Sequence, residues 1–195
     1  TGLSNFGNTL SSITIPEGVI AIGNNAFYYC ESITSIEIPA SVTTLGSGAF
    51  ANCVNLIDIT IPEGITTIKT DTFKNCKSLK TLMIPESVTT IKANAFNGTS
   101  LYNNTENWEN NILYIDDYLI VANSPISGDL QIKDGTKVIA ENAFSGYTGI
   151  TSVTIPKSLK SIGSGAFGGC TGLKEVYYSG KAGDWFRISI GENND

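Results

Sequence analysis

The chain of 195 residues contains no histidine, a single arginine and a single methionine. Histidine is the side chain used most often for general acid–base catalysis, so any catalysis would have to rely on carboxylates, a Ser–Lys pair or a thiolate. Apart from Arg187, the basic residues are lysines spread thinly along the chain, and the net charge is −6. Because nucleic acids and anionic membranes require clustered basic side chains, we expect neither as a partner.

Long apolar runs are missing as well. The longest run, Tyr118 to Ala122, is far too short to cross a bilayer, and no signal-like segment opens the sequence. With 41% apolar residues the chain can still bury a sizeable core. We therefore expect a single domain over 1–195 and no membrane insertion in this segment.

In place of these features the chain has a repeat of 23 residues. Proline and phenylalanine mark the repeat at constant spacing: Pro16, Pro39, Pro62 and Pro85, and Phe27, Phe50, Phe73 and Phe96. The same spacing between the two residue types returns later in the chain at Pro156 and Phe167. A period in the twenties predicts one strand-containing coil per repeat, and each coil buries its apolar side only by stacking on its neighbours. The sequence therefore predicts a solenoid of about six coils.

Each coil combines a strand with a turn. In the second repeat, Ile36 and Ile38 alternate with polar residues, which predicts a short half-buried strand that ends at Pro39. Val42 and Leu45 are expected to point inward, and the ring of Phe50 to fill the space between coils. The strands of successive coils are expected to form a parallel sheet.

The expected organisation has five parts. Residues 1–9 are the remnant of a preceding coil, 10–101 hold repeats one to four, 102–131 are an irregular insert, 132–173 hold repeats five and six, and 174–195 close the domain. In the insert, two apolar runs flank Asp116 and Asp117, which predicts a hairpin that either widens the sheet or stands off it as a lid. In the fifth coil, Lys133 replaces the proline and Gly135 takes an inward position.

The cysteines fall at repeat positions: Cys30, Cys53, Cys76 and Cys170. Coils about 4.8 Å apart would hold stacked Cβ atoms slightly farther apart than the roughly 3.5 to 4.5 Å that a disulfide prefers. Zinc sites draw on clustered cysteine or histidine, and histidine is missing. We predict buried, reduced thiols that act as small apolar residues, and a disulfide between neighbouring coils is the alternative in an oxidising compartment.

Acidic residues cluster in the insert: Glu106, Glu109, Asp116, Asp117 and Asp129. They could hold calcium weakly, but a solvated loop explains them equally well. Asp116 and Asp117 could also act as an acid–base pair, yet their place between two apolar runs favours a turn. We therefore predict no catalytic residue, no metal site and no cofactor.

The words "SITIPEGV", "SIEIPASV" and "SVTIPKSL", each followed by "AF" and in most coils by Cys, resemble the BspA-type leucine-rich repeats, the class also found in treponemal surface proteins. The insert "NILYIDDYLIVA" looks like a variant repeat of that family. The closing segment matches its recurrent tail at Tyr177, Tyr178, Gly180 and Trp185. The resemblance implies a leucine-rich-repeat solenoid with a parallel sheet on the concave side. It also implies extracellular or cell-surface localisation, and adhesion to host or microbial proteins.

The outward side chains of the sheet are the candidate ligand-binding face: Glu37, Asp58, Thr60, Thr81, Met83, Gln131, Thr154, Glu175 and Tyr177. The face is small, polar and mildly acidic, and Met83 and Tyr177 are its only large contacts. The first hypothesis is a non-catalytic surface or secreted module that binds an extracellular protein or glycan. The second is a structural spacer with no ligand of its own, and a third, enzymatic reading has the least support.

Overall fold

The computed structural model describes residues 13–123 and 126–194, so the coil remnant expected at 1–9 lies outside the described residues. The chain folds as a β-solenoid of about seven turns with parallel sheets and very little helix, which confirms the predicted fold class. It divides into two compact units. The described part of the first unit is 13–88 and 92–105, and that of the second is 89–91, 106–123 and 126–194.

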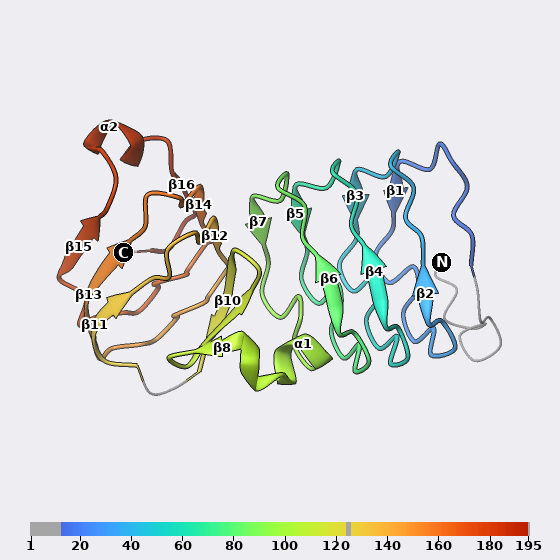
Figure 1. The fold of residues 1–195 in the computed structure, drawn as a ribbon, viewed down its shortest axis with the longest axis horizontal. Coiled ribbons are helices and arrows are strands. Elements are labelled where there is room, and N and C mark those ends of the chain that lie inside the picture. Colours follow the sequence, from blue (N-terminus) through green and yellow to red (C-terminus); the bar gives the residue numbers. More distant parts are fainter. Residues whose placement is uncertain (1–12, 124–125, 195) are drawn as a thin grey trace. The chain divides into compact units, whose positions relative to one another are not determined.

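The first unit carries two strand positions in each regular coil (Figure 1). One position forms a three-stranded parallel sheet in the order β2-β4-β6, with bounds Ser35–Ile36, Asp58–Thr60 and Thr81–Met83. The other holds β1 (Ala21–Ile22), β3 (Thr44–Leu45) and β5 (Thr67–Ile68), of which β1 and β3 pair in parallel. A short helix, α1 (Ser100–Asn103), follows the fourth coil, and Thr99 caps it by accepting a hydrogen bond from the Tyr102 amide.

The register of the sheet equals the sequence repeat. Asp58 lies beside Ser35 on one side and beside Thr81 on the other, so equivalent side chains stack on one another. The repeated phenylalanine shows the result inside the core, where the rings of Phe50 and Phe73 are fully buried and stacked with centroids 5.7 Å apart. The repeat therefore specifies side-chain packing as well as strand order.

Two positions in the turn of each regular coil adopt a left-handed backbone with positive φ. The amides of Tyr29, Asn52, Asn75 and Gly146, at the second of these positions, bond to carbonyls of the next coil, as in the 2.8 Å bond from Asn52 to Lys74. Asn, Asp and Gly tolerate this backbone, which explains why they fill nearly all of these positions. The first position holds Asn25, Gly48, Asp71, Asn94, Asn142 and Gly165, and the second holds Tyr29, Asn52, Asn75, Gly98, Gly146 and Gly169.

The second unit contains a three-stranded parallel sheet, β11-β13-β15, with bounds Gly128–Gln131, Ile150–Ile155 and Glu175–Tyr178. It also contains a six-stranded sheet in the order β16-β14-β12-β10-β9-β8. The bounds of these strands, from β8 to β16, are Trp108–Glu109, Ile112–Ile115, Tyr118–Ala122, Val138–Ile139, Ser161–Ile162 and Ser189–Ile190. The remaining elements of the described residues are strand β7 (Thr90–Ile91), the 3-10 turn η2 (Thr105–Asn107) and helix α2 (Ala182–Trp185).

The insert widens the sheet and is not a lid. The predicted hairpin forms from β9 and β10, and β10 also pairs in parallel with β12. Asp116 stands in the connecting turn with φ 50°, which confirms the predicted turn. Tyr114 and Leu119 are buried in the core cluster of the second unit. The two-residue turn and the apolar strands thus make the hairpin part of the core.

The fifth coil differs from the expectation at one position. Gly135 is exposed with φ 92°, and Thr136 is buried in the inward position instead. The prediction for Gly135 was wrong because an apolar residue was expected at the inward site, whereas the Thr136 hydroxyl is satisfied there by a 2.7 Å bond to the carbonyl of Lys133. Lys133 can replace the proline because its amide has an acceptor, the Tyr114 hydroxyl at 3.3 Å.

The closing segment forms a further rung of the second unit. Strand β15 pairs with β13 and β16 pairs with β14, both in parallel. The sequence predicted about six coils, and this rung accounts for the difference from the observed seven. Trp185 of α2 packs edge-on against Tyr178, with ring centroids 5.5 Å apart. Both helices in the described part of the chain have four residues, and neither could span a membrane.

Candidate functional site

The predicted ligand-binding residues fall into two groups, one in each unit. Glu37, Asp58, Thr60, Thr81 and Met83 lie on the sheet of the first unit, which we call the first strand face. The second strand face consists of Gln131, Thr154, Glu175 and Tyr177 on β11, β13 and β15. All of these side chains are exposed except Thr154, which is half-buried.

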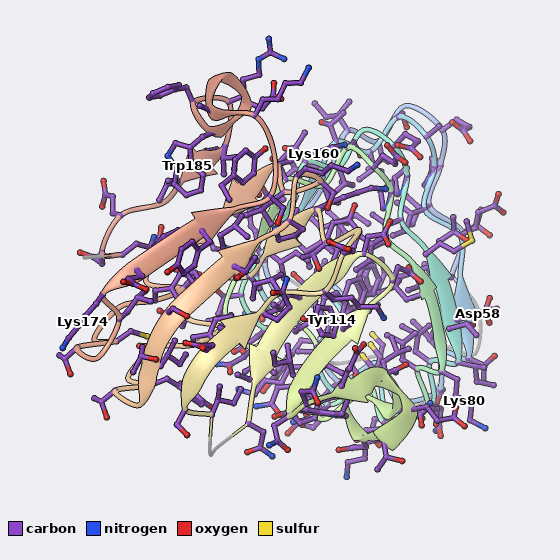
Figure 2. All side chains as sticks on the ribbon, turned by 60° about the vertical axis from the view of Figure 1, so that its left-hand side comes forward. Asp58, Lys80, Tyr114, Lys160, Lys174 and Trp185 are labelled. Atoms are coloured by element: carbon purple, nitrogen blue, oxygen red, sulfur yellow. The ribbon has the colours of Figure 1, made fainter. Side chains whose placement is uncertain are left out.

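The first strand face presents two parallel rows of side chains. Asp58 lies beside Thr81, and Thr60 beside Met83, in the register of β4 and β6. Figure 2 shows Asp58 on this sheet, with its side chain outside the core. Met83 is 78% exposed, although methionine is usually buried. The face therefore offers a carboxylate, hydroxyl groups and one flexible apolar side chain at strand spacings of about 4.8 Å.

The second strand face is tied together by hydrogen bonds. In one row Gln131, Thr154 and Tyr177 are neighbours, and in the other Asp129 lies beside Ser152. Ser152 is buried, and its hydroxyl donates a 2.7 Å bond to Asp129. The bond holds the Asp129 carboxylate in place at the edge of this face.

Tyr177 is the large side chain of the second strand face. It is 53% exposed, and its hydroxyl donates a hydrogen bond to Glu175. This bond, followed by the negative charge of Glu175, raises the pKa of Tyr177 above its usual value. Because the hydroxyl proton is already engaged, Tyr177 offers mainly its ring to a partner.

The cysteine thiols are free and buried, as predicted. Cys53, Cys76 and Cys170 each donate a hydrogen bond to the carbonyl of a phenylalanine in the preceding coil, at 3.0 to 3.1 Å. Burial raises the pKa of Cys76 to about 12. At neutral pH these groups are therefore thiols, which are neither nucleophiles nor metal ligands.

Lysines neutralise part of the acidic insert. Asp117 pairs with Lys137 at 3.1 Å, and Glu109 pairs with Lys133 at 3.3 Å. Over residues 13–123 and 126–194, no group of three or more Cys, Asp or Glu side chains could hold a metal ion. The arrangement of the insert therefore favours structural ion pairs.

One group of polar residues was missed by the sequence reasoning. The turns of the first three coils line a groove that includes Tyr29, Asn52, Asp71, Lys74 and Asn75. The sequence predicts turns here but assigns them no role in binding. The recurrence of Asn at intervals of 23 residues, with tyrosine in its place at Tyr29, was the available signal.

The sequence matches the BspA type leucine rich repeat region in six copies, over residues 4–127 and 122–184. None of the curated proteins matches the chain. Among solved structures, a leucine-rich repeat protein from Bacteroides ovatus is 28% identical to this chain. The match covers 86% of this chain and 38% of the Bacteroides ovatus chain, with a TM-score of 0.46.

Two further solved structures are similar. The leucine rich repeat protein of T. pallidum is 24% identical, with 93% of this chain and 74% of that chain covered and a TM-score of 0.45. A leucine rich cell surface protein from Faecalibacterium prausnitzii is 23% identical. The match covers 98% of this chain and 65% of that chain, with a TM-score of 0.33. Since the six matched repeats span nearly the whole chain, it belongs to the BspA-type leucine-rich repeat family.

Proposed function

We propose that this chain is a non-catalytic recognition module of a surface-displayed or secreted protein, and that its strand faces bind an extracellular protein or glycan. The observation that carries the proposal is the fixed register of exposed side chains on two parallel sheets. A rigid sheet loses little conformational entropy on binding, so side chains in fixed rows are suited to recognition. Family membership supports the extracellular setting, because surface display is what the resemblance implies.

The chemistry of the two faces favours binding over catalysis. Their polar groups are carboxylates, hydroxyls and one amide, and each face adds one large contact, Met83 or Tyr177. Residues of these two types are adaptable or anchoring contacts at protein interfaces. The only arginine, Arg187, is not on either strand face and pairs with Asp184 at 3.5 Å. The faces therefore suit a partner that supplies hydrogen-bond donors.

The spacer hypothesis also has an observation in its favour. Thr60, Thr81 and Thr154 are small hydroxyl residues on a sheet, where threonine is expected from strand propensity alone. A spacer would need stacked coils and would not need particular outward residues. Its test is the same binding experiment.

The experiment is binding of the purified chain to arrays of extracellular matrix proteins and glycans, at two salt concentrations. One variant removes an acid and a large side chain from the first face, Asp58→Ala with Met83→Ala. A second does the same on the second face, Glu175→Ala with Tyr177→Ala. We expect saturable binding that at least one variant weakens about tenfold or more.

Matched controls remove the same kinds of side chain elsewhere. Glu63→Ala with Ile20→Ala serves the first unit, and Glu192→Ala with Phe186→Ala serves the second, since all four side chains are exposed. Binding that the controls keep and a face variant loses supports the proposal. Absence of binding to every probe, or equal binding by all variants, would overturn it and favour the spacer.

A further inference from the structure

A polar groove crosses the turn side of three coils in the first unit. Its lining comes from the turns that follow β1, β3 and β5. The lining includes the side chains of Tyr28, Tyr29, Asn52, Asp71, Lys74 and Asn75. These residues belong to the turns and are therefore separate from the first strand face.

Tyr29 is the unusual residue of this groove. It has φ 59° at a position where the following coils have Asn52 and Asn75. A bulky side chain is rarely found in this backbone conformation, because its Cβ crowds the backbone. The Tyr29 ring packs edge-on against the Tyr28 ring, with centroids 4.6 Å apart. Tyr29 is nevertheless 46% exposed, so burial does not account for a tyrosine at this position. A strained, exposed aromatic residue beside a groove is a signal of function.

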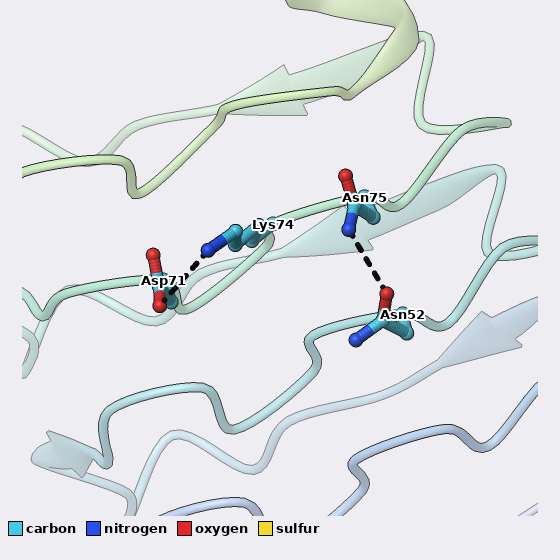
Figure 3. Close-up of polar contacts among 4 residues, drawn as sticks. All are labelled: Asn52, Asp71, Lys74 and Asn75. Carbon is cyan, nitrogen blue, oxygen red and sulfur yellow. Dashed lines mark hydrogen bonds and ion pairs between the residues drawn. The ribbon is translucent and has the colours of Figure 1, made fainter.

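The polar lining contains two side-chain pairs, one between neighbouring coils and one within a single turn (Figure 3). Asn75 donates an amide hydrogen bond of 3.0 Å to the Oδ1 of Asn52. Lys74 lies 3.4 Å from the Oδ2 of Asp71, while the Oδ1 of Asp71 is buried and accepts no hydrogen bond from the described residues. The pair of opposite charges leaves the lining close to neutral.

These features identify the chemical class of the ligand. We propose that the groove binds a neutral oligosaccharide. Sugar hydroxyls donate and accept at once, which suits an amide and carboxylate lining, and the tyrosine rings offer an apolar surface for the C–H face of a pyranose. Coils repeat at about 4.8 Å, which is close to the length of one sugar unit, so successive units can meet equivalent turns.

An extended peptide is a poorer fit to the same groove. A peptide strand binds by pairing with free backbone groups, but the amides of Asn52 and Asn75 already bond to the carbonyls of Lys74 and Asn97, both at 2.8 Å. A strongly charged ligand is not favoured either, because Asp71 and Lys74 offset each other. The inference rests on the proposed recognition role and adds a ligand class and a site apart from the strand faces.

The test is a printed array of short neutral oligosaccharides, followed by calorimetric titration of the best binder. Tyr29→Gly removes the ring and the backbone strain together, so we expect binding at least about tenfold weaker while the melting temperature stays equal or rises. Asn52→Gly keeps a residue that tolerates φ 63° and removes the amide, and should also weaken binding. Phe186→Ala removes an exposed aromatic ring of the second unit and should change nothing.

Two results would overturn the inference: no saturable binding of any neutral oligosaccharide, or equal binding by Tyr29→Gly, Asn52→Gly and the unaltered chain. If saccharide binding is lost only in the strand-face variants, the proposed function is supported and the groove is not the saccharide site. If Tyr29→Gly and Asn52→Gly lose saccharide binding and no probe needs the strand faces, the groove proposal is supported and the strand-face proposal fails.

Discussion

The left-handed turn positions make individual residues hard to replace. At Gly48, with φ 62°, a Cβ would collide with the Oδ1 of Asn25 in the preceding coil. Gly18 has φ 87° but open space around it. The two glycines thus separate the cost of backbone strain from the cost of a steric clash.

We predict that Gly48→Ala destabilises the first unit by at least about 2 kcal/mol, since backbone strain and overpacking add. Gly18→Ala should cost about 1 kcal/mol, from strain alone. Urea unfolding followed by circular dichroism measures both. Equal losses in the two variants would show that the contact with Asn25 relaxes freely.

The buried thiols predict a loss of stability at alkaline pH. Burial raises the pKa of Cys76 to about 12, from an ordinary value of 9.0. Below pH 9 both the folded and the unfolded chain keep the proton, so the stabilisation is complete. Between pH 9 and 12 only the unfolded chain releases it, so the free energy of unfolding falls by about 1.4 kcal/mol per pH unit for this thiol.

Denaturant unfolding at about pH 8, 9 and 10 tests this expectation. Cys76→Ala should be less stable than the unaltered chain at pH 8, because it leaves a small cavity, but its stability should decline less steeply with pH. Parallel pH profiles for the two proteins would show that the thiol does not contribute to the dependence.

The inward residues were the most predictable part of the sequence. Val42, Leu45 and Phe50 are buried as expected, because a fixed period and apolar character suffice to locate them. Thr136 was missed because a buried hydroxyl depends on a local carbonyl, which composition does not reveal. The turn groove was missed because its neighbours come from three coils and its backbone angles are invisible to a hydrophobic pattern.

The hairpin shows what can and cannot be predicted for an element. Its strands and its turn at Asp116 were predictable from two apolar runs around polar residues. Whether it joined the sheet was not, because the pairing of β10 with β12 joins residues that the sequence pattern does not relate. Its four β9 residues are all buried, which shows that the hairpin supports the second unit.

We predict that Leu113→Ala destabilises the second unit by about 2 to 5 kcal/mol, since Leu113 is fully buried in β9. Asn110→Gly is the control, because Asn110 has φ 51° in an exposed turn that glycine accepts readily. Thermal unfolding monitored by near-ultraviolet circular dichroism reports on the packing around Tyr114. A lid-like hairpin would leave the transition unchanged in both variants.

Charge acts at the scale of the whole molecule. With 12 basic and 18 acidic residues, the chain carries a net charge of −6. A lysine-rich peptide that binds the strand faces should therefore bind several-fold more weakly when ionic strength rises from about 0.01 M to 0.1 M, because the Debye length falls from about 30 Å to about 10 Å. A salt titration by fluorescence anisotropy measures this.

Saccharide binding in the neutral groove should respond to salt differently from peptide binding on the strand faces. Asp71 and Lys74 form an ion pair in its lining, and an uncharged saccharide has no counterions to exchange, so its affinity should not change over the same salt range. A saccharide affinity that falls with salt would place the ligand elsewhere on the molecule. The whole-molecule charge was predictable from composition, but its distribution between two kinds of surface was not.

The register of the first unit also bears on how such proteins evolve. Since Ser35, Asp58 and Thr81 are neighbours 23 residues apart, every interior coil offers the same hydrogen-bonding edge above and below. An in-frame duplication or loss of one such block in the gene would leave the remaining joins intact. Recombination could therefore lengthen or shorten the protein without a new core, while point mutations in the outward residues change what each added coil displays.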